Sequence, residues 1–209
     1  MIAIIQARSN SKRFKNKVLK LIHNKTMIEH VYDRVKRSKL IKKIFVATST
    51  NKTDDKLAKH LKTKRINYFR GDLNNVAKRL LDLAKKKKLK YFMRISGDSP
   101  LIDYKIINTA CKIYIKSNNA YHIITNLYPR TFPKGQSVEI IKTSILKQSI
   151  KSFSNSDKEH VTKYFYNNAS KFKIKNFYFK GKTKIKNQSV DKKKDLDLII
   201  KKYNKNLKN

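Results

Sequence analysis

The chain has 209 residues, of which 39% are hydrophobic, including ten Phe and eleven Tyr. This length and apolar content suit one folded domain and exclude an intrinsically disordered chain. The formal net charge is +38, but only nine of the 52 basic residues are Arg, and Lys is spread along the whole chain. Dispersed Lys is typical of solvated surface, so we expect no specific nucleic-acid site, although a basic nucleic-acid-binding protein stays an alternative.

The single cysteine, Cys111, lies in a helical pattern and cannot form an internal disulfide, so we expect a core residue and a reducing compartment. The apolar run at the start of the chain has about five residues and is followed at once by Arg8. That run is too short for a signal peptide or a membrane span. The sequence therefore predicts a cytoplasmic protein that does not bind a membrane.

Short β-branched runs alternate with helical patterns through the first 125 residues. The helix that follows the first strand opens with a capping box from Thr26 to Glu29. This alternation predicts a mostly parallel sheet with helices on both faces. The predicted strands are 2–6, 43–49, 66–71, 90–96 and 120–126, and the predicted helices are 26–38, 53–63, 74–88 and 103–117.

The rest of the chain has a less regular pattern. Strands are predicted at 137–142 and 172–179, a helix at 156–168, and a short strand end that leads into a terminal helix within 189–203. The sequence contains no internal repeat and no linker rich in Pro, Gly or Ser. We therefore predict a single α/β domain over residues 1–209.

Charged side chains follow the ends of several predicted strands, where ligands bind in open parallel sheets. Asp98 follows the strand 90–96, and Asp191 follows the short extended piece near the end of the chain. Cations beside carboxylates suit a polyphosphate bound with a hard metal ion such as Mg²⁺. The loop 7–18 after the first strand supplies the cations and a hydroxyl: Arg8, Ser11, Arg13 and Lys17.

Each of these features also has a purely structural explanation. A basic loop can be solvated surface, Asp98 in Gly-Asp-Ser-Pro can be a turn residue, and Asp191 can cap the last helix. Asp103, directly before a helical pattern, is predicted to be such a cap. The five His have no metal-ligand spacing, and no Gly-rich phosphate loop is present. Only the joint occurrence at strand ends favours a binding site.

The chain resembles the cytidylyltransferase family that includes the spore coat polysaccharide biosynthesis F proteins, with CMP-KDO and CMP-acylneuraminate synthetases as more distant relatives. The similarity follows the family's order over nearly the whole chain. It rests on the stretches "IIQARSNSKRFKNKVLK", "MIEHVYDRVKRSKLIKKIFVATS", "FRGDLNNVAKRLLDLA", "RISGDSPLID", "RTFPKGQSVEI", "DKEHVTKYF" and "SVDKKKDLDLI".

This resemblance implies a Rossmann-like nucleotide-diphospho-sugar transferase fold of the GT-A type. In such a fold, residues 1–125 would bind CTP, 126–188 would form a smaller layer for sugar binding and homodimer contacts, and 189–209 would carry a metal ligand and a helix. The implied reaction is attack of a sugar hydroxyl on the α-phosphorus of CTP, with release of pyrophosphate, in surface polysaccharide or glycan biosynthesis.

Family roles can be transferred to individual positions of this sequence. The resemblance implies that Asp98 and Asp191 bind Mg²⁺, and that Arg13, Lys17 and Asp98 serve catalysis. Arg79 and Arg130 are implied contacts with the base or the sugar, and the implied sugar-binding residues are Arg130 and Ser137. The implied nucleotide and triphosphate contacts are Arg8, Ser11, Arg13, Lys17 and Arg79.

The sequence departs from the family pattern at a few positions. Asn10, Lys15 and Asn16 stand where the family has Gly and a Pro-Gly pair, although Asn tolerates left-handed backbone angles better than most residues. Asn75 and Ser137 stand where the family usually has Asp. These departures keep open the alternative of a sugar-nucleotide-binding glycosyltransferase or an inactive relative of the same fold.

Overall fold

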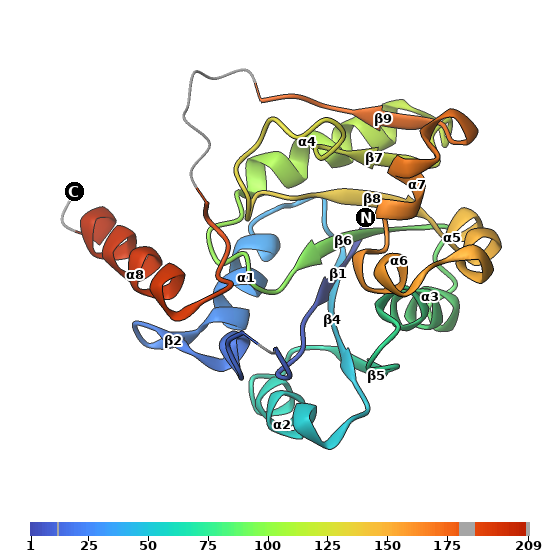
Figure 1. Cartoon of the computed structure of the whole chain (residues 1–209). Coiled ribbons are helices and arrows are strands. Elements are labelled where there is room, and N and C mark those ends of the chain that lie inside the picture. Colours follow the sequence, from blue (N-terminus) through green and yellow to red (C-terminus); the bar gives the residue numbers. More distant parts are fainter. Residues whose placement is uncertain (12, 180–186, 208–209) are drawn as a thin grey trace.

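The computed structural model describes residues 1–11, 13–179 and 187–207 (Figure 1). In these residues a seven-stranded sheet has the strand order β5-β4-β1-β6-β8-β7-β9. Its strands come both from residues 1–125 and from the residues that follow them. The strands are β1 (Ile2–Gln6), β4 (Lys43–Ser49), β5 (Tyr68–Gly71), β6 (Tyr91–Ser96), β7 (Ile123–Thr125), β8 (Glu139–Lys142) and β9 (Ile174–Asn176).

The sheet is mostly parallel, as the alternation of strands and helices predicts. β1 pairs in parallel with β4 and β6, β4 with β5, and β7 with β9. β8 is antiparallel to both of its neighbours, β6 and β7. The carboxyl ends of β1, β4 and β6 therefore lie along one edge of the sheet, which is where a ligand site is expected.

Helices cover both faces of the sheet. On one face α1 (Met27–Lys36), α2 (Asp55–Thr63) and α4 (Tyr104–Lys116) bury Val31, Leu57 and Ile107. Cys111 belongs to the same cluster, so its prediction as a core residue is confirmed, and burial raises the pKa of its thiol to about 11. The other face is covered by α3 (Val76–Lys86), α5 (Thr143–Ser149), α6 (Asn155–His160) and α7 (Lys163–Asn167).

Two predicted helix caps are confirmed. The Glu29 carboxylate accepts hydrogen bonds from the backbone N–H of Thr26 at 2.9 Å and from its hydroxyl at 2.7 Å, which completes the capping box of α1. The Asp103 side chain accepts the backbone N–H of Lys105 at 2.9 Å at the start of α4. Both caps satisfy amide groups that a helix start leaves unpaired.

The predicted helix 156–168 is wrong as a single element, because it is divided into α6 and α7. Val161 between them is buried and has a φ of 33°, a left-handed value that is rare for a β-branched residue. The break lets the next residue, Thr162, donate its hydroxyl to Glu139 on β8 at 2.5 Å. A contact that is distant in sequence therefore overrides the helical pattern.

Several short elements were not expected from the sequence. β2 (Leu21–Ile22) and β3 (Lys25–Thr26) form a small hairpin, and α5 follows β8 directly. The 3₁₀ helices are η1 (Lys17–Leu19), η2 (Lys52–Asp54), η3 (Ile150–Ser152) and η4 (Ala169–Lys171).

The terminal helix α8 (Lys193–Leu207) lies beside β2 at one side of the molecule (Figure 1). It is held there by a third apolar cluster, in which Leu196 and Ile199 pack with Ile22, Met27 and Val190. The strand end predicted before this helix is wrong, since residues 187–191 contain no strand. They form an irregular segment that reaches the sheet edge.

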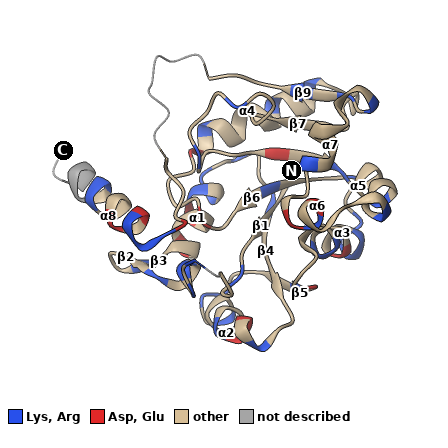
Figure 2. Ribbon diagram, viewed as in Figure 1, with Lys and Arg blue, Asp and Glu red and all other residues tan. Residues whose placement is uncertain are grey.

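Figure 2 shows Lys and Arg distributed over helices, strands and loops rather than gathered on one element. None of the helices in the described part of the chain is long and apolar enough to cross a membrane.

Candidate functional site

A cleft of about 830 Å³ opens at the carboxyl ends of β1 and β6. Its wall combines the first loop, the turn after β6, the segment before β8 and the residues before α8. All nine residues that the sequence singles out as site residues line this cleft. They are Arg8, Ser11, Arg13, Lys17, Arg79, Asp98, Arg130, Ser137 and Asp191.

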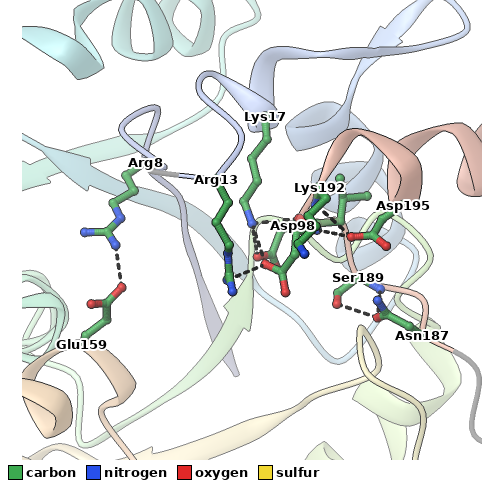
Figure 3. Close-up of polar contacts among 11 residues, drawn as sticks. Arg8, Arg13, Lys17, Asp98, Glu159, Asn187, Ser189, Lys192 and Asp195 are labelled. Carbon is green, nitrogen blue, oxygen red and sulfur yellow. Dashed lines mark hydrogen bonds and ion pairs between the residues drawn. The ribbon is translucent and has the colours of Figure 1, made fainter.

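Lys17 lies at the centre of the charged part of the cleft (Figure 3). Its ammonium nitrogen is 2.7 Å from Asp98 Oδ2 and 3.3 Å from Asp191 Oδ1, and it donates to the carbonyl oxygen of Val190 at 2.8 Å. The Lys17 side chain is only 11% exposed, which strengthens these ion pairs relative to a surface pair. One cation thus joins two carboxylates from distant parts of the chain.

The two arginines of the first loop also pair with carboxylates. Arg13 lies 3.2 Å from Asp191, and Arg8 lies 2.5 Å from Glu159 on α6 (Figure 3). The Arg13 side chain is 64% exposed, so its pair is largely screened by water. A bound polyanion can therefore take the place of these carboxylates at modest cost.

Backbone hydrogen bonds hold the described part of the first loop, residues 7–11 and 13–18, despite its departures from the family pattern. Asn16 has φ 56° and ψ 23°, the left-handed conformation that a Gly adopts easily. The carbonyl oxygen of Ser9 accepts the backbone N–H groups of Ser11 at 2.9 Å and of Asn16 at 2.8 Å. Asn16 thus takes the left-handed angles that its residue type tolerates, and the loop places Lys17 over the strand ends.

Gly97 brings Asp98 close to the first loop. A Cβ atom at Gly97 would lie 2.8 Å from the carbonyl oxygen of Gln6 and 2.9 Å from the Cβ of Ala7, so no larger residue fits without a shift. The Gly97 N–H donates to the same Gln6 carbonyl at 2.8 Å. The Asp98 carboxylate then faces Lys17 across the cleft.

Gly135 allows a similarly close approach of the segment that carries Asp191. It has a φ of +90°, and a Cβ atom there would lie 2.5 Å from the carbonyl group of Gln188. Gln188 donates its N–H to Lys134 at 2.8 Å, and Val190 donates its N–H to the carbonyl oxygen of Asp98 at 2.9 Å. The segment before α8 is therefore fastened to both sides of the cleft, and it carries Asp191 to the first loop.

The alternative that Asp191 caps α8 does not match the geometry. Asp195 accepts the backbone N–H groups of Asp191 at 2.9 Å and Lys192 at 2.8 Å, whereas the Asp191 carboxylate pairs with Arg13 and Lys17. The Asp98 carboxylate likewise faces Lys17. Both carboxylates point into the cleft.

Arg79 enters the cleft from α3 as a buried cation. The residue is 1% exposed, and its Nη1 donates to the carbonyl oxygen of Asp72 at 2.7 Å. Its Nε is buried without a hydrogen-bond partner among the described residues. Burial lowers the pKa of the Arg79 guanidinium to about 10, which leaves it protonated at neutral pH.

Two further residues that line the cleft, Arg130 and Ser137, contact each other. Arg130 donates from Nη1 to the Ser137 hydroxyl at 3.2 Å. Burial lowers the pKa of Arg130, and the nearby Glu139 carboxylate opposes that shift. Ser137 thus keeps a polar contact at a position where the family usually has Asp.

A buried ion pair near Ser137 was not predicted from the sequence. Arg94 of β6 donates to Glu139 of β8, which is 1% exposed, and also to Gln6 at 2.7 Å. Glu139 further accepts the hydroxyl groups of Thr162 at 2.5 Å and Tyr166 at 2.8 Å. A charged residue inside each of two apolar strand patterns is the signal that could have identified the pair.

The residues present are compatible with a magnesium ion. Among the described residues no group of three or more His, Cys, Asp or Glu could hold a metal by itself. Asp98 and Asp191, however, share the Lys17 ammonium, so their carboxylates already converge on one positive charge. Mg²⁺ commonly uses one or two carboxylates together with substrate phosphates, which is the donor set that this cleft offers.

This chain is similar in sequence and in structure to known proteins over most of its length. The cytidylyltransferase family model matches residues 2–207. An uncharacterized protein of Methanocaldococcus jannaschii is 31% identical over 205 residues, which is 96% of this chain and 82% of that protein. The spore coat polysaccharide biosynthesis protein SpsF of Bacillus subtilis is 26% identical over 180 residues, or 83% of this chain and 73% of SpsF.

A solved cytidylyltransferase structure from Leptospira borgpetersenii has a TM-score of 0.88 and 26% identity, covering 99% of this chain and 95% of its own. The match confirms the Rossmann-like nucleotidyltransferase fold. The family model covers nearly the whole chain, including the cationic loop and the two carboxylates of the cleft, and the chain belongs to the cytidylyltransferase family.

Proposed function

We propose that this protein transfers CMP from CTP to a sugar hydroxyl group and releases pyrophosphate, in the biosynthesis of a surface polysaccharide or glycan. Membership of the cytidylyltransferase family supports CTP as the nucleotide, and the name of the Bacillus relative supports the pathway. The observation that carries the proposal is the convergence of Lys17, Asp98 and Asp191 in a cleft beside Arg8 and Arg13.

The first loop would bind the triphosphate. Arg8 and Arg13 offer guanidinium groups for bidentate contacts with phosphate oxygens, and Ser11 offers a hydroxyl. On binding, phosphate oxygens replace Asp191 and Glu159 as partners of these arginines. Arg13 and Lys17 would then neutralise the negative charge that grows on the leaving pyrophosphate.

The reaction needs no nucleophilic side chain. The sugar hydroxyl oxygen forms a bond to the α-phosphorus, the bond from that phosphorus to the pyrophosphate oxygen breaks with its electron pair staying on pyrophosphate, and the hydroxyl proton passes to water. The protein contributes by holding both substrates in position and by offsetting charge. Asp98 and Asp191 would hold Mg²⁺, which supplies Lewis-acid polarisation of the phosphate when it is bound.

The acceptor sugar would lie toward Arg130 and Ser137, which line the same cleft as the first loop. Arg79, a buried cation that lines the cleft, would contact the nucleotide. A homodimer and a cytoplasmic location, both expected from the sequence, stay predictions.

The direct test is product formation from CTP and Mg²⁺ with a panel of acidic and neutral sugars, measured as released pyrophosphate and as CMP-sugar. We expect product with one sugar class, with CTP strongly preferred over ATP. A glycosyltransferase would instead consume a preformed nucleotide-sugar. Release of nucleotide from CMP-sugars, without pyrophosphate from CTP, would replace the proposal by that alternative.

A further inference from the structure

Asp54 is a carboxylate buried behind the cleft. It ends η2, shortly after β4, and its residue exposure is 0%. Its Oδ1 accepts the backbone N–H of Ser9 at 2.5 Å, and its Oδ2 accepts the backbone N–H of Ser49 at 3.0 Å and the Ser49 hydroxyl. A single side chain therefore joins the end of β4 to the start of the first loop.

The contact with Ser9 reaches further into that loop. Ser9 is 2% exposed, and its carbonyl oxygen accepts the N–H groups of Ser11 and Asn16. Asn16 directly precedes Lys17, whose ammonium group binds Asp98. The hydrogen bonds thus run from the Asp54 carboxylate through the backbone N–H and carbonyl group of one residue, Ser9, to Ser11 and Asn16 of the loop that lines the cleft.

Asp54 also supplies negative charge near Arg79. Burial lowers the pKa of Arg79, and among the charges that act on it the Asp54 carboxylate is the largest that raises it. Arg8 acts in the opposite sense, and Asp72 in the same sense as Asp54. A buried cation without a counter-charge is costly, so Asp54 helps to keep Arg79 charged where it faces the cleft.

We propose that Asp54 is a positioning residue of the nucleotide site. It does not line the cleft, and it acts through Ser9, which holds the first loop, and through Arg79, whose buried charge it balances. The inference rests on the proposed function, because it takes the CTP triphosphate as the ligand of that loop. A purely structural role would be stabilisation of the turn between β4 and α2, with no effect on CTP.

The experiment compares full-length Asp54→Asn, Asp54→Glu and Glu29→Gln with the unmodified protein. Glu29 is the matched control, because it is also a buried carboxylate that accepts a backbone N–H and a hydroxyl, from Thr26, but it does not line the cleft or contact the loop. Binding of CTP with Mg²⁺ is measured by calorimetry, and stability by thermal unfolding. Asp54→Glu keeps the negative charge and displaces the carboxylate. It is therefore the variant used to test the inference if Asp54→Asn does not fold.

We expect all three variants to unfold at a lower temperature, but only the two Asp54 variants to bind CTP about ten-fold or more weakly, because a displaced loop misplaces its cations. Amide hydrogen exchange at Ser9 and Asn16 should also become faster in the Asp54 variants. Unchanged CTP affinity in a folded Asp54 variant would overturn this inference and leave the proposed function intact. Failure of the unmodified protein to bind CTP would overturn both.

Discussion

Lys17 Nζ lies 2.7 Å from Asp98 Oδ2, and its other two hydrogen bonds go to Asp191 and to the carbonyl oxygen of Val190. A lysine ammonium has three donors, so every donor is used without any ligand. A triphosphate that binds Lys17 must therefore replace protein acceptors, and a cation that binds Asp98 and Asp191 would release Lys17 for that purpose. Under the proposed function, these two exchanges of charge partners would favour binding of nucleotide and metal together.

Asp98→Asn and Asp191→Asn should each lower kcat by at least about 100-fold, which is the typical effect of removing one charge-stabilising group from an active site. Both side chains are partly exposed, 24% and 41%, so the fold should persist. Steady-state kinetics over a Mg²⁺ titration and circular dichroism check this. Unmodified activity with the same Mg²⁺ dependence in either variant would remove that residue from the metal site.

CTP with Mg²⁺ should raise the melting temperature more than ATP with Mg²⁺ or CTP with a chelator. A ligand at about 100 times its dissociation constant adds roughly 2.7 kcal/mol, which corresponds to about 5–10 °C for a domain of this size. Arg13→Ala should remove most of that rise, whereas Arg37→Ala, an exposed cation outside the cleft, should not. Equal shifts with CTP, ATP and inorganic triphosphate, unaffected by Arg13→Ala, would show unspecific binding to a basic protein.

The Glu29 capping box should make stability fall in acid. Burial raises the pKa of Glu29, but hydrogen bonds from Thr26 and Lys64 outweigh it and lower the pKa from 4.5 to about 2. The unfolded chain then binds more protons than the folded one between these values, so the stabilisation is present above pH 4.5 and is lost as the pH falls toward 2.

Glu29→Gln lacks this titration. From pH 6 to pH 3 the free energy of unfolding of the unmodified protein should fall by about 2 kcal/mol more than that of the variant. Urea unfolding at both pH values measures the difference. A constant difference between the two proteins would show that Glu29 titrates normally.

The buried pair of Arg94 and Glu139 should appear in a double-mutant cycle. Arg94→Met leaves the Glu139 charge buried without its cation and should destabilise the protein by about 3 kcal/mol or more. Adding Glu139→Gln to Arg94→Met removes that uncompensated charge and should recover part of the loss. Additive effects in the cycle would mean that the two side chains do not stabilise each other.

Binding to nucleic acid should be weak and without sequence preference, because Lys and Arg residues are spread over the helices, strands and loops of the fold (Figure 2). Titration with duplex and single-stranded DNA between roughly 50 and 200 mM salt should show affinity falling by orders of magnitude. Tight binding that persists at the higher salt concentration would favour the nucleic-acid-binding alternative.

Local features of this protein could be predicted because neighbouring residues determine them. The alternation of apolar runs identified the strands up to 96 and the helices between them, since hydrophobic period depends only on residues within one element. The box from Thr26 to Glu29 and the left-handed Asn16 follow from side chains and backbone preferences within a few positions. The cationic loop after β1 was recognisable for the same reason.

Contacts between distant residues were decided only by the tertiary structure. Antiparallel β8 lies between β6 and β7, and this position pairs Arg94 with Glu139. Glu139 also accepts a hydrogen bond from the Thr162 hydroxyl, next to Val161, where the predicted helix breaks. Asp191 reaches Lys17 because the segment before α8 fits closely against Gly135 and α8 packs against the hairpin β2–β3. No local pattern encodes such partners, because each contact depends on where the whole sheet brings two segments together.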